Sequence, residues 1–293
     1  MEFSIVIPNL NSPVIDQTIN ALLRQQPQGQ YEIIIVGRDA PGLIKQSPQV
    51  TFICTDKPVW AAVARNIGLR MAGGEIICFL DADCIPRADW LSRIEERFRE
   101  PQIFVLGGGV DSKQSGFWAV CNHLISFHEY LVSMPAGTRQ ELPSLNLAIR
   151  KSVLDEVGGF DEDIAPTEDS YLTTRLRQRG YALNFDPQIV VDHLPNRRTA
   201  AAVLQHTWRH GYHTIKVDPQ WSEFLSLPFP FRHRKTLFLT APAIALYVTL
   251  GIYWVDRKVW RWWYVAPAIY ALKVVYCLGA AELMRVESRI RGR

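Results

Sequence analysis

The sequence predicts an α/β fold followed by an apolar, basic C-terminal region, and three observations carry this prediction. Short runs of β-branched residues alternate with amphipathic helical patterns in the first 100 residues. Each run is continuous, as in strands buried on both faces of a parallel sheet. From residue 232 onward, eleven Lys and Arg residues face three acids, and four of the nine tryptophans lie there. We therefore expect a body over residues 1–231 with net charge −5 and an appended region over 232–293 with net charge +8.

The first 80 residues predict four strands and two helices. The strands are expected at 3–7, 32–36, 50–54 and 75–80, and the helices at 13–25 and 59–72. Ser12 is the expected N-cap of the first helix, with Pro13 in its first turn, and Gly73 and Gly74 end the second. This order favours a nucleotide-binding α/β architecture, in which ligands bind at the carboxyl ends of the strands.

The pattern is looser beyond residue 100. We expect strands at 103–106 and 182–191 and helices at 117–134, 151–157, 168–179 and 199–210. The glycine run 107–109 lacks the spacing of a dinucleotide-binding fingerprint. Five cysteines form no Cys-x-x-Cys pair, which argues against a disulfide scaffold or a zinc site and favours a reducing, cytosolic compartment.

The C-terminal region predicts two apolar helices, at about 237–255 and 262–282. The first has no charged residue and is long enough to cross a bilayer, and the second contains Lys273. Between them a basic segment flanked by Trp and Tyr is typical of a membrane interface. Three arrangements remain open: two spans, helices lying in the membrane plane, or helices buried against the body. Nucleic-acid binding is not expected of an acidic body.

The strand at 75–80 leads into Asp81-Ala-Asp83 at the expected ligand-binding edge. If the strand continues through this motif, Asp81 and Asp83 point the same way. Two carboxylates so placed suit a hard divalent cation whose other ligands are phosphate oxygens. Alone, Asp-x-Asp is more often a turn or a cap, and its place after a buried strand gives it weight.

Thr167, Glu168 and Asp169 begin the helix expected at 168–179. Thr167 is a candidate N-cap, and acids in a first helical turn are favoured by the helix dipole. A carboxylate there that faces a cleft can also accept a proton from a substrate hydroxyl.

Five motifs, taken in order, resemble those of the family 2 glycosyltransferases. They are Ile5-Val-Ile-Pro-Asn-Leu-Asn11, Ala64-Arg-Asn-Ile-Gly68, Phe79-Leu-Asp-Ala-Asp83, Asn146 with Gly158-Gly-Phe-Asp161, and Glu168-Asp169 with Gly180-Tyr181. The resemblance covers about residues 3–215. It implies a GT-A fold, with a mixed, mostly parallel sheet flanked by helices, and an inverting transfer from a nucleotide sugar.

The resemblance also implies residue roles. Asp83, with Asp81 nearby, would bind Mg2+ or Mn2+ on the donor diphosphate, and Asp169, with Glu168 beside it, would be the general base. The donor-side candidates are Pro8, Asn11, Asp39, Arg65, Asp81 and Asp83, Asn146 is the acceptor-side candidate, and His193 is a candidate third metal ligand. Arg65 as a helix-surface ion pair, Asn146 as a helix cap and His193 as a backbone-bonded strand end remain alternatives.

Three departures from the family pattern qualify these roles. Leu10 stands where an aromatic residue is usual, and Arg38-Asp39 stands where Asp-Asp is common. Trp208-Arg209 reverses the last pair of the motif of processive members, which favours transfer of a single sugar over polymer synthesis.

The expected function is metal-assisted transfer of one sugar to a lipid-linked sugar, a lipid or a polysaccharide precursor, at the cytoplasmic face of the membrane. A nucleotidyltransferase and a catalytically degenerate sugar-nucleotide-binding scaffold are the alternatives. The first would need a Gly-rich basic loop after the first strand, which Pro8-Asn-Leu-Asn11 does not supply, and a scaffold would need neither Asp83 nor Asp169.

Overall fold

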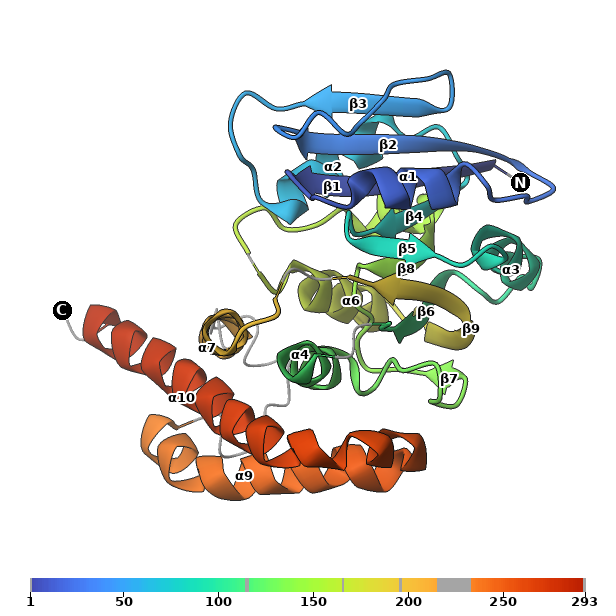
Figure 1. Ribbon diagram of the computed structural model, residues 1–293. Helices are drawn as coiled ribbons and strands as arrows, with labels where there is room; N and C mark the ends of the chain where they lie inside the picture. The colour runs from blue at the N-terminus through green and yellow to red at the C-terminus, as the bar shows by residue number, and fades with distance from the viewer. Residues whose placement is uncertain (1, 114–115, 165, 195–196, 215–232, 292–293) are drawn as a thin grey trace. The chain divides into compact units, whose positions relative to one another are not determined.

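The computed structural model describes residues 2–113, 116–164, 166–194, 197–214 and 233–291 (Figure 1). The chain divides into two compact units. The first contains Met1–Lys113 and Glu129–Leu194, and the second contains Gln114–His128 and Pro195–Arg293. Each unit is described separately.

A single mixed sheet organises the first unit. Its strands are β1 (Glu2–Leu10), β2 (Gln30–Arg38), β3 (Val50–Cys54), β4 (Ile76–Leu80), β5 (Cys84–Pro86), β6 (Val105–Asp111), β7 (Gly137–Thr138), β8 (Asn146–Arg150) and β9 (Leu183–His193). They follow the order β3-β2-β1-β4-β8-β6-β9-β5, and β7 pairs with β9. β1 to β4 are mutually parallel, β8 is antiparallel to both β4 and β6, and β6 is parallel to β9. The sheet is therefore mixed, with a parallel half at its N-terminal side, as predicted.

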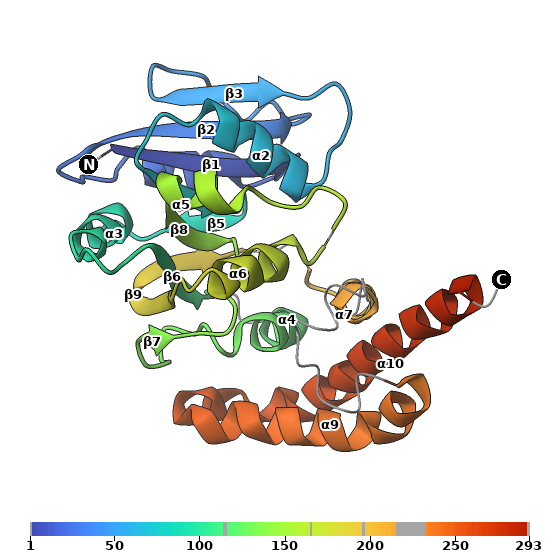
Figure 2. The ribbon, with the colours of Figure 1, turned by 180° about the vertical axis from the view of Figure 1, so that it is seen from behind.

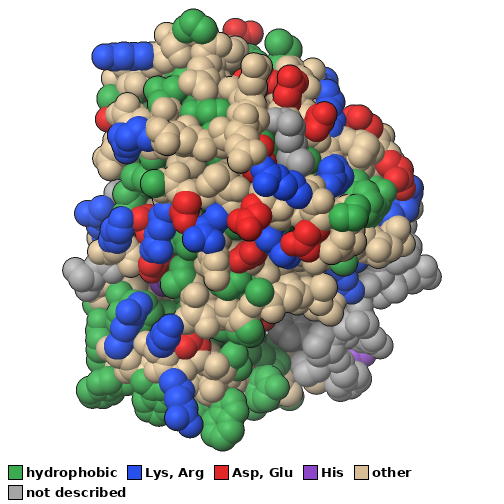
Figure 3. All heavy atoms as spheres, turned by 90° about the vertical axis from the view of Figure 1, so that its right-hand side faces the viewer, with side chains coloured by type: hydrophobic (Ala, Val, Ile, Leu, Met, Phe, Trp, Pro, Cys, Tyr) green, Lys and Arg blue, Asp and Glu red, His purple; other side chains and the backbone are tan. Residues whose placement is uncertain are grey.

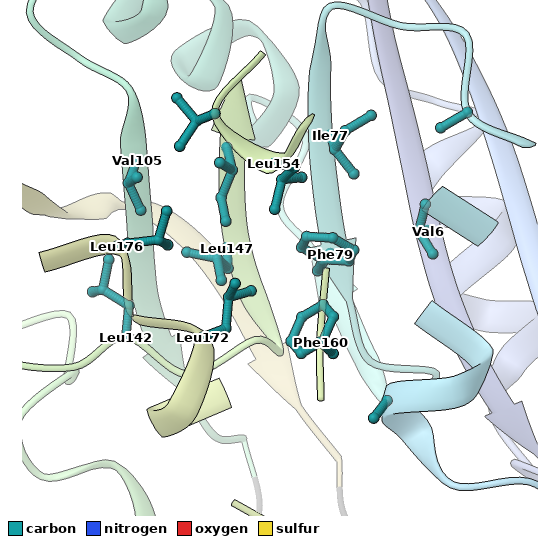
Figure 4. Packing of buried hydrophobic residues seen from close by; sticks show 14 of the residues in the cluster. Val6, Ile77, Phe79, Val105, Leu142, Leu147, Leu154, Phe160, Leu172 and Leu176 are labelled. Atoms are coloured by element: carbon teal, nitrogen blue, oxygen red, sulfur yellow. The ribbon is translucent and has the colours of Figure 1, made fainter. Parts of the chain in front are cut away.

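Helices cover both faces of this sheet (Figures 1 and 2). They are α1 (Ile15–Leu22), α2 (Ala61–Met71), α3 (Trp90–Phe98), α5 (Lys151–Val157) and α6 (Glu168–Gln178). α2, α5 and α6 lie on one face, where their apolar side chains pack with those of β1, β4, β6 and β8 (Figures 2 and 4). Every residue of β4 is buried, which explains its continuous apolar sequence.

Two predicted helix starts differ in detail from the structure. α1 begins at Ile15, and Val14 rather than Ser12 is its N-cap residue. The Ser12 hydroxyl donates instead to the Ala82 carbonyl, at 3.0 Å. Thr167 does precede α6, but its side chain makes no capping hydrogen bond.

The second unit is helical in its described residues. It contains α4 (Phe117–Phe127), α7 (Ala200–Thr214), α9 (Arg234–Val255), the 3-10 helix η2 (Arg257–Val265) and α10 (Ala266–Arg291). α4 is shorter than the predicted 117–134 segment. The second apolar helix begins at Ala266 and not at 262, because the backbone is non-helical at Trp262. By length and composition, two helical stretches, Arg234–Val255 and Arg257–Met284, could cross a membrane.

Candidate active site

The carboxyl ends of five strands meet at one edge of the sheet. β1, β2 and β4 are parallel, and β6 and β9 run in the same direction because β8 is antiparallel to both β4 and β6. This edge brings together the ends of β1 and β2, the loop after β4, and His193 at the end of β9. It is the edge at which α/β proteins bind their ligands.

Two hydroxyl groups hold the loop Asp81–Asp83 in place through hydrogen bonds to its backbone. Ser12 Oγ and Thr18 Oγ1 both donate to the Ala82 carbonyl, at 3.0 Å and 3.2 Å. β4 ends at Leu80 and β5 begins at Cys84, so the strand does not continue through the motif. The condition for Asp81 and Asp83 to point the same way is therefore not met, and the two carboxylates have different neighbours, Arg65 for Asp81 and His193 for Asp83.

Arg65 is the buried centre of the site. Its guanidinium donates to Asp81 Oδ1 at 2.7 Å and to Glu168 Oε1 at 2.8 Å, and only 3% of the residue is exposed. It also lies over the ring of Phe160, 5.2 Å from the ring centre. Burial opposes its charge, but the carboxylates of Asp81, Glu168 and Asp169 together raise its pKa. The helix-surface alternative for Arg65 is wrong, because this side chain joins the loop after β4 to the start of α6.

Two neighbours of Arg65 explain how α2 reaches this position. A Cβ on Gly68 would lie 2.4 Å from Val6 Cγ1, so glycine permits close packing of α2 on β1. Asn66 binds the backbone of Phe160 twice: Nδ2 donates to its carbonyl and Oδ1 accepts from its N–H, each at 2.8 Å. A Cβ on Gly159 would lie 2.4 Å from Asn66 Oδ1, so glycine is required there as well.

Glu168 and Asp169 at the start of α6 have different environments. Glu168 is buried, with Oε1 bound to Arg65 and Oε2 without a hydrogen bond. Asp169 is partly exposed, and its oxygens accept from the backbone N–H groups of Ser170 at 2.9 Å and Ser144 at 3.3 Å. Burial raises the pKa of both carboxyls above their ordinary values, against the opposing charge of Arg65. Asp169 is thus a fixed, partly exposed carboxyl group with a raised pKa.

Asp83 and His193 form the group best suited to a divalent cation. Asp83 Oδ2 lies 3.7 Å from His193 Nε2, and the pairing of Cys84 with His193 in the β5–β9 ladder sets this approach. Among the described residues, potential ligand atoms of Asp83, Cys84 and His193 lie within 4.8 Å of one another. Burial raises the pKa of the Cys84 thiol well above its ordinary value, and a hard cation such as Mn2+ prefers oxygen and nitrogen donors to sulfur. The carboxylate and the imidazole remain as donors, a set that fits Mn2+ or a similar cation with open positions for oxygen ligands.

The residues predicted to be on the donor side lie at or near the ends of β1 and β2, and two of them hydrogen-bond neighbouring backbone. Asn11, at φ 57°, donates its N–H to Arg38 O and accepts the Ala40 N–H through Oδ1. Asp39 Oδ2 accepts from Ile44 N at 2.7 Å, while its buried Oδ1 has no hydrogen bond. Pro8 lies in β1 and pairs with Val36 of β2, two residues before the last pair of these strands, Leu10 with Arg38.

Two residues at which the sequence departs from the family pattern have clear positions. Leu10 is 58% exposed at the end of β1, on the edge where ligands are expected. Arg38 donates to the carbonyls of Thr55 and Asp56 and ties β2 to the loop after β3.

Asn146 is committed to the fold and not to a substrate surface. Only 2% of it is exposed, its Oδ1 accepts from Trp90 Nε1, and its Nδ2 donates to the carbonyls of Gly109 and Ile189. It neither caps α5 nor has a hydrogen-bonding group left for an acceptor. We therefore correct the acceptor-side prediction: Asn146 joins β8 to β6 and β9.

Sequence reasoning assigned no role to Asn66 or Phe160. Both stand in motifs that the sequence displays, Arg65-Asn-Ile-Gly68 and Gly158-Gly-Phe-Asp161, but their mutual contact spans 94 residues. Phe160 also packs edge-on against Phe79 in β4, with ring centres 4.9 Å apart (Figure 4).

Comparison with known proteins identifies the family of this chain. The family model of glycosyl transferase family 2 matches residues 4–158, more than half of the chain. The chain belongs to this family. It is 25% identical to the glycosyltransferase AglE of Haloferax volcanii over 224 residues, 73% of each protein. It is also 30% identical to the probable glycosyltransferase YdaM of Bacillus subtilis over 266 residues, which cover 80% of this chain and 60% of that protein.

Solved structures show the same fold. The mannosyltransferase PcManGT of Pyrobaculum calidifontis, in complex with GDP-Man and Mn2+, superposes with a TM-score of 0.59 at 21% identity, covering 94% of this chain and 86% of that one. TarS 1–349 of S. aureus superposes with a TM-score of 0.51 at 12% identity, covering 100% and 92%. The first unit of this family 2 glycosyltransferase therefore has the GT-A fold, and two apolar helices follow it near the C-terminus.

Proposed function

We propose that this glycosyltransferase moves a single sugar from a nucleoside-diphosphate sugar to an acceptor hydroxyl, with inversion at the anomeric carbon. One observation carries the proposal. Arg65 joins the loop that carries Asp83 to the helix start that carries Asp169. A cation-binding group and an accessible base are thus held by one buried residue.

Asp169 is the proposed general base. Its two backbone hydrogen bonds fix the carboxylate, and its raised pKa makes it a better proton acceptor than an ordinary aspartate. Removing the acceptor's proton strengthens the oxygen as a nucleophile, and such help is typically worth about 10² to 10⁴-fold. Attack opposite the leaving diphosphate gives inversion in a single displacement, so no second carboxylate needs to act as a nucleophile.

Glu168 has a supporting role in this proposal. Its buried carboxylate holds Arg65, and burial together with the neighbouring charge of Asp169 raises the pKa of the Glu168 carboxyl. In this proposal the two acids at the start of α6 have different roles. Glu168 positions Arg65, and Asp169 contacts the acceptor hydroxyl.

Asp83 and His193 are proposed to hold Mg2+ or Mn2+ on the donor diphosphate. When bound, the cation neutralises the charge that develops on the leaving diphosphate. Asp81 lies outside the group of potential ligand atoms, and its Oδ1 is bound to Arg65. Its proposed contribution is to fix the loop in which Asp83 stands.

The residues at this edge of the sheet and the similar proteins both support a nucleotide sugar as the donor. Asp39 Oδ1 is buried without a partner at the end of β2, and Asn11 and Pro8 lie at the neighbouring strand end. We assign this region to the nucleoside. The Pyrobaculum mannosyltransferase was solved with GDP-Man and Mn2+, which supports a sugar nucleotide and a divalent cation as the ligands here.

The acceptor is proposed to be membrane-bound, namely a lipid-linked sugar, a lipid or a polysaccharide precursor at the cytoplasmic face. The support is the second unit, with its two long apolar helices and its Lys and Arg residues. An enzyme attached to a bilayer by this unit meets lipid acceptors at high local concentration.

The test is a donor and acceptor screen with the full-length protein in mild detergent. Nucleotide sugars with Mn2+ or Mg2+ are scored by release of nucleoside diphosphate, and NMR of the product gives the anomeric configuration. Asp169→Asn should lose at least about 100-fold in turnover. Asp155→Asn, which changes an exposed acid on α5, is the matched control. Equal turnover of Asp169→Asn and wild type would remove the base assignment, and a product of retained configuration would remove the single displacement.

A further inference from the structure

α9 exposes one apolar side along its whole length. The opposite side is buried, through Leu237, Ala241, Ala245, Thr249 and Ile252, and packs with α10. The exposed residues recur at helical spacing: Phe238, Leu239, Pro242, Ala243, Leu246, Tyr247, Leu250, Trp254 and Val255. We call these nine residues the apolar stripe. Leu239, Tyr247 and Trp254 are 78%, 80% and 87% exposed. So large an exposed apolar surface marks a binding site.

Cations stand at both ends of the apolar stripe. Arg234 and Lys235 precede it, and Arg257, Lys258 and Arg261 follow it, all of them exposed. The acid among them, Asp256, is buried and accepts the Lys258 N–H at 2.8 Å. Figure 3 shows hydrophobic side chains gathered with Lys and Arg side chains in the lower part of its view. This charge pattern complements an anionic lipid surface.

Aromatic residues continue the apolar stripe into η2. Trp260 and Trp263 are 58% and 66% exposed, and the Trp260 indole N–H donates to the Tyr253 carbonyl at 2.9 Å. Tyr253 in turn donates its hydroxyl to the Trp262 carbonyl, so the turn is held rigidly against the end of α9. Tryptophan side chains that are fixed and half in water are typical of the boundary between headgroups and acyl chains.

The side of α10 that faces away from α9 is covered by protein. A Cβ on Gly211 would lie 2.0 Å from the Tyr276 carbonyl oxygen, and one on Gly279 would lie 2.5 Å from the Trp208 carbonyl oxygen. α7 and α10 are therefore in close backbone contact. Between residues 266 and 284, Pro267 and Ala271 are the exposed residues of α10. This distribution differs from that of a two-helix hairpin surrounded by lipid.

The covering helices are unsuited to the bilayer interior. α7 carries Gln205, His206, Arg209 and His210 on its 15 residues. α4 has 11 residues and stands in the sequence between Lys113 and Glu129. α4 also contacts η2, through Phe117 with Tyr264 and His123 with Trp262. If α9 and α10 crossed the membrane, η2 would lie about 30 Å away on the far side and would draw α4 and its charged flanks into the hydrocarbon.

We propose that the second unit binds an anionic lipid bilayer through the apolar stripe, with α9 lying in the plane of the membrane surface and not crossing it. α9 is then an interfacial anchor whose stripe enters the boundary of headgroups and acyl chains, while α10, α4 and α7 stay on the aqueous side. The proposal deepens the membrane attachment put forward above, and none of its tests depends on sugar transfer.

A depth profile along the apolar stripe tests the orientation of α9. Nitroxide labels are placed by Leu239→Cys, Leu246→Cys and Trp254→Cys in a Cys54→Ser background, because Cys54 is the exposed cysteine among the described residues. Power-saturation EPR is recorded with vesicles of phosphatidylcholine and phosphatidylglycerol. An in-plane helix gives similar depths at all three positions, about 5–10 Å. Met71→Cys, exposed on α2, is the aqueous control.

The spanning alternative predicts a different profile. The 22 residues of α9 extend over about 33 Å. In a spanning helix Leu246 would lie near the bilayer centre, with Leu239 and Trp254 near opposite surfaces. That profile would overturn the proposal.

Sidedness gives an independent test that uses the native Cys54 as an internal reference. The Lys258→Cys variant, which retains Cys54, is bound to sealed vesicles and then treated with a membrane-impermeant maleimide. In the in-plane arrangement both Cys54 and residue 258 react from outside. Protection of residue 258 while Cys54 reacts would show that η2 has crossed the bilayer, and the proposal would fail.

Charge dependence identifies the partner. Each cation near an anionic surface contributes about fivefold to binding, so a Lys235→Gln, Lys258→Gln and Arg261→Gln variant should bind vesicles about 100-fold more weakly. Removal of three exposed cations of the first unit, Arg24, Lys45 and Lys57, should change binding little. A second copy of the chain is the other candidate occupant of the apolar stripe. If the protein formed a dimer without lipid, with the labels on the apolar stripe immobilised, and did not bind vesicles, the partner of the stripe would be a second copy of the chain and not the membrane.

Discussion

Replacement of Arg65 by Met separates the contributions of its two acidic partners. Arg65 is buried and binds Asp81 and Glu168, at 2.7 Å and 2.8 Å. Removing one member of a buried ion pair costs about 3–5 kcal/mol, because its partner is left charged and unpaired. The two partners are not equal: the Glu168 side chain is 10% exposed and that of Asp81 is 33% exposed. Most of the cost in Arg65→Met should therefore come from Glu168.

Double variants make this division measurable. Glu168→Gln in the Arg65→Met background removes the buried charge and should recover about 1–3 kcal/mol of the free energy of unfolding. Asp81→Asn in the same background should recover less than about 1 kcal/mol, because water already reaches Asp81. Arg65→Lys should be intermediate, since one ammonium group cannot reproduce the two directions of a guanidinium.

The assay is urea unfolding of the full-length protein in mild detergent, followed by hydrogen exchange of peptides from β4 and α6. Arg93→Met is the matched control, because its ion pair with Asp89 is exposed and should be worth less than about 1 kcal/mol. If Arg65→Met costs no more than this control, or if Asp81→Asn rescues it as well as Glu168→Gln does, Arg65 is not the buried centre of the site.

Three further predictions concern the base, the cation and the packing of α2. Because burial raises the pKa of Asp169 in the folded protein, the stability linked to its protonation is present below the unfolded pKa and is lost as pH rises through the folded one. The melting temperature of Asp169→Asn should therefore be higher than that of wild type at pH 7, and the difference should vanish below about pH 4. A higher melting temperature of wild type at pH 7 would contradict this prediction. His193→Ala should weaken Mn2+ binding at least about 10-fold, as measured by EPR of the free ion, whereas unchanged affinity would exclude His193 as a ligand. Gly159→Ala should cost about 1–3 kcal/mol of the free energy of unfolding, because the new Cβ displaces Asn66 from Phe160. The control Gly116→Ala, which has open space around it, should change the free energy of unfolding by no more than about 0.5 kcal/mol. Equal effects of the two substitutions would refute the packing argument.

The strands and the order of the fold are encoded locally, which is why the sequence alone predicts them. β1, β2 and β4 are continuous apolar runs bounded by turn residues, and such runs have few alternatives to a buried parallel strand. The place of β8 between β4 and β6 was not predictable, because it depends on pairings between residues that are 40 or more positions apart in the sequence.

The site was predictable in its residue types but not in its pairings. The motifs locate Asp83, Asp169 and Arg65, yet the partner of Arg65 in α6 lies 103 residues away and leaves no local signal. Asp81 and Asp83 were expected as a pair because period-two alternation was assumed to continue, and the turn after Leu80 ends it. Asn146 was misassigned because a polar residue at a sheet edge has the same sequence signature whether it contacts a ligand or three groups of the fold.

The contacts of α2 also have a consequence for how such enzymes diversify. The family match ends at residue 158, so Asp169, the proposed base, lies beyond it. Across that boundary, Arg65 and Asn66 reach the later segment at Glu168 and at the Phe160 backbone. A chimera that keeps residues 4–158 and imports a different acceptor-binding segment must retain these two attachment points. Because the proposed base Asp169 and the proposed metal ligand His193 both lie in the imported segment, recombination at this boundary would exchange the two together and leave the ends of β1 and β2 unchanged.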